Sequence, residues 1–111
     1  MREVGAPELL DQIERGVAPP IVDVRSRAEY EHGHVPGAIH IPFTTLLFGR
    51  APVPLDRDRP VVVYCGHGPR ARLAAAGLRR RGFIDVRLLA GHMSAWKSEG
   101  RRSICGKLRG H

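Results

Sequence analysis

The stretch VVVYCGHGPR, Val61 to Arg70, decides the fold because it joins a buried strand to a helix through a short turn. Four large residues in a row are typical of a strand that is covered on both faces of a sheet. The residues that follow the turn, 70–82, have the periodicity of a helix that ends at Gly82. One face of this helix is predicted to consist of Leu73, Ala74, Gly77 and Leu78.

Strand and helix signals alternate along the rest of the chain. Further strands are predicted at residues 21–24, 38–42 and 84–89. Further helices are predicted at residues 7–16, 26–33, 43–49 and 91–100. Ser26 and Glu29 have the spacing of a capping box at a helix start, and residues 50–60 have the composition of a surface loop. The alternation predicts an α/β domain with a mainly parallel sheet, in which ligands bind beyond the carboxyl ends of the strands, where Cys65 lies.

The composition narrows the class of protein. The chain has 111 residues, which suits one compact domain, and 42% of them are hydrophobic, as in an ordinary globular fold. No apolar run approaches the roughly 18 residues of a membrane helix, and the N-terminus lacks the apolar core of a secretory signal. Only two cysteines occur, Cys65 and Cys105, which favours a reducing compartment. We therefore expect a cytoplasmic protein without a membrane partner.

The net charge of +7 comes from 18 Lys and Arg residues against 11 Asp and Glu residues. Such a charge attracts small anions. The arginine runs at residues 79–81 and from Arg101 onward are interpreted as a solvated helix face and a loose tail. Because only 5% of residues are aromatic and none is interleaved with the arginines, the sequence disfavours a nucleic-acid partner, and binding to RNA through the basic face stays the alternative.

The position of Cys65 favours a reactive thiolate. Gly66 and Gly68 let the backbone curl so that successive N–H groups point inward, and Pro69 suits the first position of a helix. These N–H groups, the positive end of the helix and Arg70 would stabilise a thiolate, and also an anion attached to its sulfur. On local features alone, an inert cysteine buried beside a tight turn remains the alternative.

Three motifs, in order along the chain, resemble the rhodanese family. IVDVRSRAEYEHGHVPGAIHIP, residues 21–42, resembles the family's first signature, a strand ending in Asp-x-Arg followed by a Gly-His-Ile/Val-Pro-Gly-Ala pattern. CGHGPRA, residues 65–71, resembles its active-site loop, and LLAGHMSAWKSEG, residues 88–100, resembles its Gly-Gly-x-x-Ala-Trp signature. The resemblance implies a three-layer α/β/α domain over residues 1–100 with a five-stranded, mainly parallel sheet, followed by a basic tail at residues 101–111.

The resemblance also implies an activity: a thiosulfate sulfurtransferase that forms a persulfide on Cys65 and uses no cofactor or metal. Its substrates would be a small anionic sulfur donor, thiosulfate or a persulfide, and a thiol or cyanide acceptor, with a protein sulfur-relay partner as a further option. The loop has the Cys-x4-Arg spacing of rhodaneses, whereas related phosphatases and arsenate reductases have Cys-x5-Arg. The alternatives are such an oxyanion enzyme and a non-catalytic rhodanese-like binding module.

The resemblance gives the loop residues Gly66, His67, Gly68, Pro69 and Arg70 the task of binding the anion. The loop departs from the family pattern, because Gly66 replaces a frequent basic residue and Ala71 a frequent Ser or Thr. His67 would compensate as a donor when protonated, or point to solvent.

Other residues have supporting roles in this interpretation. His92 replaces the second glycine of the last signature and is expected either at the pocket mouth or in surface packing. Asp23, Arg25 and Glu29 are expected to give structural support, with Asp23 helping to shape the loop. His32 and His34 lack the further ligands of a metal site, and His34 is interpreted as structural. Cys105 is either inert or an internal partner of Cys65.

Overall fold

The computed structural model describes residues 2–50 and 52–101. Within these residues the strands are β1 (Arg2–Val4), β2 (Ile21–Asp23), β3 (Ile39–His40), β4 (Val61–Tyr64) and β5 (Val86–Leu89). The helices are α1 (Ala6–Glu14), α2 (Arg27–His32), α3 (Phe43–Phe48), α4 (Pro69–Arg80) and α5 (His92–Ser98). Every predicted element is present. β1 is an addition that the sequence pattern did not indicate, and the predicted tail beyond Arg101 lies outside the described residues.

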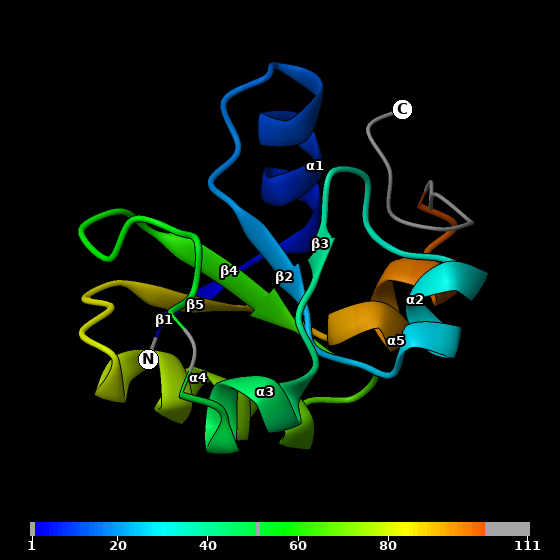
Figure 1. The fold of residues 1–111 in the computed structure, drawn as a ribbon. Coiled ribbons are helices and arrows are strands. Elements are labelled where there is room, and N and C mark those ends of the chain that lie inside the picture. The colour runs from blue at the N-terminus through cyan, green and yellow to red at the C-terminus, as the bar shows by residue number, and fades with distance from the viewer. Residues whose placement is uncertain (1, 51, 102–111) are drawn as a thin grey trace.

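The strands form one five-stranded parallel sheet in the order β1-β5-β4-β2-β3 (Figure 1). β4 lies at the centre and pairs with β2 and β5. Since all strands run the same way, their carboxyl ends meet at one edge, and Cys65 leaves the sheet there. The α/β fold with a five-stranded parallel sheet between helices is confirmed.

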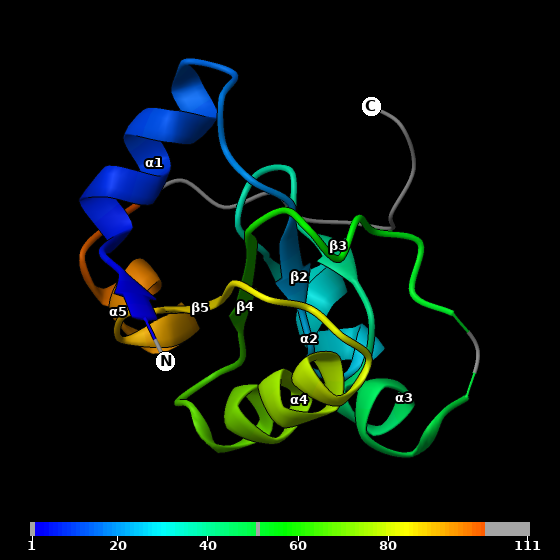
Figure 2. The same ribbon diagram turned by 90° about the vertical axis from the view of Figure 1, so that its left-hand side faces the viewer.

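Helices cover both faces of the sheet (Figures 1 and 2). Side chains of α3 and α4 pack on one face, and side chains of α1, α2 and α5 pack on the other. The alternation of β4 divides its residues between the two cores, with Val61, Val63 and Cys65 on the first face and Val62 and Tyr64 on the second. Met93 and Trp96 of α5 are core residues, as predicted. No helix in the described part of the chain is long and apolar enough to cross a membrane.

The buried face of α4 differs from the predicted one. Its buried residues are Ala71, Ala74, Ala75, Gly77 and Leu78. Leu73 is 46% exposed, because it lies two residues, about half a turn, from both Ala71 and Ala75. The small residues let α3 approach closely, and a Cβ atom on Gly77 would lie only 2.2 Å from the Leu46 carbonyl oxygen.

Residues 79–81 were expected to form a solvated helix face. Two of these arginines instead make contacts with α3. Arg81 donates to the carbonyl oxygens of Leu46 and Gly49, and Arg80 donates to Leu47 O at 3.0 Å. These contacts satisfy carbonyl groups at the C-terminal end of α3. Part of the basic excess therefore joins α4 to α3.

Candidate active site

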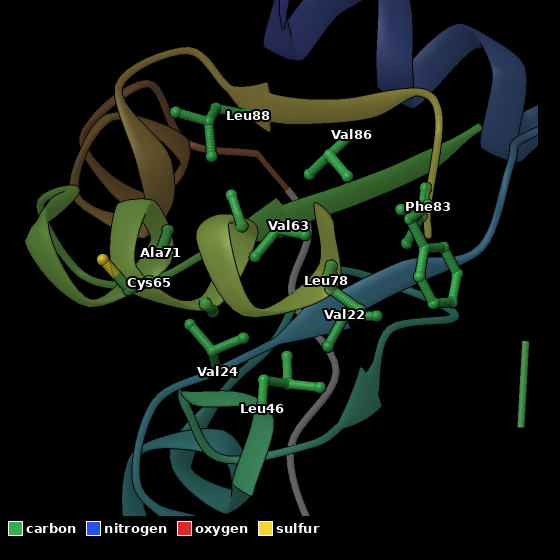
Figure 3. Packing of buried hydrophobic residues seen from close by; sticks show 13 residues of the cluster. Val22, Val24, Leu46, Val63, Cys65, Ala71, Leu78, Phe83, Val86 and Leu88 are labelled. Atoms are coloured by element: carbon green, nitrogen blue, oxygen red, sulfur yellow. The ribbon is translucent and has the colours of Figure 1, made fainter. Parts of the chain in front are cut away.

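Cys65 follows β4 directly and belongs to the hydrophobic core on the α3 and α4 face of the sheet (Figure 3). Its side chain is fully buried, and Gly68 N–H donates a hydrogen bond to its Sγ atom at 2.9 Å. Gly68 has a φ of +129°, a left-handed value that favours glycine, and α4 begins at the next residue, Pro69. The turn thus folds one backbone donor back onto the sulfur.

The first turn of α5 holds the other side of this loop. Met93 N–H donates to Cys65 O, and Ser94 N–H donates to Gly66 O, both at 3.0 Å. Because N–H groups at a helix start have no partner within the helix, they are available for these loop carbonyls. α5 therefore fixes the loop from outside the sheet.

The loop does not supply a donor at every position. Pro69 has no N–H group, so among the residues expected to bind the anion it can contribute only to the shape of the loop. The other four residues of the loop, Gly66, His67, Gly68 and Arg70, each have an N–H group, and the one that donates to Cys65 Sγ is that of Gly68. The His67 residue is exposed.

Arg70 is paired with Glu29. Its guanidinium donates to both carboxylate oxygens, at 2.7 and 3.1 Å, and so joins the start of α4 to α2. Glu29 is also the acidic half of a capping box with Ser26, as the sequence predicted. The hydrogen bonds from Arg70, with those at Ser26, lower the pKa of Glu29 to about 2.

The depressed pKa of Glu29 predicts an acid-sensitive contribution to stability. The contribution is fully present above the ordinary pKa of 4.5 and is lost as the pH falls toward 2. We expect Glu29→Gln to lower the unfolding temperature at neutral pH and to narrow its difference from wild type across this window. Glu31→Gln is the matched control, because Glu31 lies on the same helix and its ion-pair partner, Arg27, is a highly exposed residue of that helix. A difference from wild type that is constant with pH would contradict the prediction.

A buried ion pair lies beside the loop. Arg25 donates to Asp23 through Nε at 3.1 Å and Nη2 at 2.8 Å, and the two side chains are 4% and 0% exposed. Asp23 also accepts from Tyr64 Oη–H at 2.7 Å, since β2 and β4 place these residues opposite each other. Tyr64 immediately precedes Cys65, so this network anchors the backbone from which the loop departs.

The network extends to the loop between α2 and β3. Val35 N–H donates to Tyr64 Oη at 3.0 Å, and Arg25 Nη2 donates to Gly33 O at 2.6 Å. Burial, with the nearby Asp23 carboxylate, raises the pKa of Tyr64, which stays neutral and can donate and accept at once. The sequence pattern flagged Asp23 and Arg25, whereas Tyr64 was missed because it reads as one more residue of a buried strand.

The histidines of the first signature have structural contacts. His34 Nδ1 lies 2.8 Å from Tyr30 O, and its ring stacks on the Tyr30 ring with centroids 3.8 Å apart. His40 Nε2 lies 2.7 Å from Arg25 O. Among residues 2–50 and 52–101 no group of three or more His, Cys, Asp or Glu side chains is placed to hold a metal ion.

His92 lies beneath the loop, whereas the sequence suggested the pocket mouth or the surface. It is 5% exposed, and its Nδ1 atom accepts a hydrogen bond from Cys65 N–H at 3.2 Å. In the sequence, His92 stands out because it replaces the second glycine of the Gly-Gly pattern. That departure marks an unusual residue but does not predict where its side chain points. Cys105 lies outside the described residues.

Comparison with known proteins agrees with this geometry. The family model for the Rhodanese-like domain matches residues 5–99. Thiosulfate sulfurtransferase GlpE of Pseudomonas fluorescens is 39% identical over 79 residues, which are 70% of this chain and 70% of that protein. The probable adenylyltransferase/sulfurtransferase MoeZ of Mycobacterium tuberculosis is 34% identical over 83% of this chain, but the match spans only 24% of that protein's length.

Solved structures show the same fold. The Alr3790 protein from Anabaena has a TM-score of 0.79 and 32% identity, with 93% of this chain and 80% of that chain covered. A rhodanese-related protein from Thermoplasma volcanium has a TM-score of 0.75 and 27% identity over 94% of this chain and 98% of that chain. The relatives of similar length support the expected enzyme class, a transferase of the sulfurtransferase type. With a family match across residues 5–99 and the three signatures in order, the chain belongs to the Rhodanese-like domain family.

Proposed function

We propose that this domain is a sulfurtransferase that carries sulfane sulfur on Cys65 as a persulfide. The observation that carries the proposal is the hydrogen bond from Gly68 N–H to Cys65 Sγ, 2.9 Å long, within a Cys-x4-Arg loop at the end of the central strand. A backbone donor aimed at this sulfur stabilises negative charge on it. That stabilisation serves both the attacking thiolate and the persulfide.

The reaction has two steps. The Cys65 thiolate attacks the outer sulfur of thiosulfate; the Sγ–S bond forms while the S–S bond of thiosulfate breaks, and sulfite leaves with the bonding electron pair. A cyanide or thiolate acceptor then attacks the outer sulfur of the persulfide, and Cys65 leaves as a thiolate. Such covalent catalysis predicts ping-pong kinetics.

The supporting residues divide the remaining tasks. We assign the N–H groups of Gly66, His67 and Arg70 to binding the anion that the sulfur carries, beside the Gly68 N–H group that already donates to Sγ. Because the Arg70 guanidinium is already paired with Glu29, we assign it chiefly to fixing the loop against α2. Asp23 and Arg25 hold the end of β2 beside Tyr64.

Thiosulfate is the first donor to test, since the relatives of similar length are named for it. Gly66 and Ala71 give the loop fewer side-chain donors than a basic residue and a hydroxyl would, so a persulfide donor belongs in the same experiment. A cytoplasmic location and a protein acceptor in a sulfur relay remain predictions.

The deciding experiment is the mass of the intact protein after incubation with thiosulfate or with glutathione persulfide. We expect a gain of one sulfur, about 32 Da, which cyanide removes. A peptide digest should locate the added sulfur on Cys65. Failure with both donors, together with hydrolysis of p-nitrophenyl phosphate or reduction of arsenate, would overturn the proposal in favour of an oxyanion enzyme.

A further inference from the structure

His92 has a backbone conformation that a non-glycine residue rarely adopts. Its φ is +53°, and it is the one non-glycine residue with a positive φ within residues 2–50 and 52–101. Glycine would adopt this conformation without steric cost, and glycine is the residue of the signature that this segment resembles. A histidine that keeps a strained conformation at the edge of an active-site loop points to a task for its side chain.

The imidazole contacts both ends of the turn that carries Cys65. Nδ1 accepts from Cys65 N–H at 3.2 Å, so Nδ1 carries no proton and the neutral ring is protonated at Nε2. The other edge of the ring faces Gly68, where a Cβ atom would lie 3.3 Å from Nε2. Gly68 is the residue whose N–H group donates to Cys65 Sγ.

We infer that His92 is a positioning residue of the active-site loop: its neutral imidazole holds the Cys65 backbone, and protonation of the ring releases that hold. The inference rests on the proposed sulfur transfer and adds a residue through which pH would act on it. A protonated ring would present Nδ1–H to Cys65 N–H, and two donors cannot bond to each other. The loop would then lose one of its fixed points directly at the nucleophile.

The surroundings favour the neutral ring. Burial lowers the pKa of His92. Electrostatic interactions with Arg72 on α4 and with His67 in the loop lower it further. Glu3 on β1 is the opposing charge and favours the protonated form. The lowered pKa favours the neutral ring, the form whose Nδ1 atom accepts from Cys65 N–H.

Two substitutions separate positioning from mere packing. His92→Asn keeps an oxygen acceptor near the position of Nδ1 and tolerates the left-handed backbone, but it does not titrate. His92→Gly relieves the strain and removes the acceptor. We expect His92→Asn to load sulfur at a rate close to wild type at neutral pH, and His92→Gly to load it about 10-fold more slowly, as for loss of one hydrogen bond.

The pH profile is the readout that a packing role would not move. The rate of sulfur loading by wild type should fall at low pH as His92 is protonated, and His92→Asn should lack this fall. Any dependence of the rate on pH that the Cys65 thiol itself causes should persist in both proteins. His67→Asn, at the histidine within the loop itself, is the matched control and should keep the fall in rate that protonation of His92 causes. Equal profiles in wild type, His92→Asn and His92→Gly would overturn the inference, as would loss of this fall in His67→Asn alone.

A second measurement works without any donor. In an NMR titration of the full chain, the Cys65 amide signal of wild type should shift with the protonation of His92, and it should not do so in His92→Asn. If wild type loads no sulfur but this coupled titration is present, the positioning contact stands and the proposed function fails. An amide signal that is insensitive to His92 would overturn the positioning role even in an active transferase.

Discussion

Replacing Cys65 by serine is expected to abolish sulfur transfer, with a loss of about 1,000-fold or more, as for removal of a covalent nucleophile. A serine hydroxyl is almost fully protonated near neutral pH and cannot form a persulfide. Its Oγ atom can still accept the hydrogen bond from Gly68 N–H that Sγ accepts at 2.9 Å, so the loop should keep its shape. The steady-state rate of cyanide-dependent sulfur release measures the effect.

Cys105→Ser is the control for this substitution. If Cys105 is inert, the variant should transfer sulfur like wild type. If Cys105 accepts the sulfur internally, the variant should still be loaded on Cys65 but should release the sulfur more slowly to an external acceptor. Full activity of Cys65→Ser, with an unchanged circular dichroism spectrum, would contradict the covalent scheme.

The central part of the fold was predictable because its signals are local. A run of buried residues followed by Gly-x-Gly-Pro and a periodic helix permits few other structures, and β4, the loop and α4 follow that pattern. β1 was not predictable in this way. It is a three-residue edge strand in which Arg2 and Glu3 are exposed, and it exists because it pairs with β5 from the far end of the chain.

In the candidate site too, local contacts could be predicted from the sequence, whereas contacts between distant segments could not. The capping box of Ser26 and Glu29 has a spacing of three residues, so it can be identified in the sequence. The contacts of Tyr64 with Asp23 and of His92 with Cys65 depend on strand register and on the docking of α5, which sequence spacing does not encode. Charge alone was also insufficient, since Arg81 resembles a solvated arginine until α3 is packed beside it.

Asp23→Ala is expected to lower the free energy of unfolding by about 3–5 kcal/mol, as for loss of one partner of a buried ion pair. The variant leaves the Arg25 guanidinium 4% exposed without its carboxylate, and it removes the acceptor of the Tyr64 hydroxyl. For a domain with a total of about 5–15 kcal/mol, such a loss is a large fraction of the stability. Urea titration of wild type and variant measures it.

Asp85 provides a matched control because it forms an Asp-x-Arg pair of the same spacing with Arg87. That pair is partly exposed, with the Asp85 and Arg87 side chains 29% and 18% exposed, so Asp85→Ala should lower the free energy of unfolding far less than Asp23→Ala does. A double variant, Asp23→Ala with Arg25→Met, should recover part of the loss, since it removes the unpaired buried charge. Equal costs for Asp23→Ala and Asp85→Ala would show that burial at the end of β2 does not make this pair structurally important. A larger loss of stability for Asp23→Ala, reduced in the double variant, would show that burial of the Asp23–Arg25 pair makes it important for the stability of the domain.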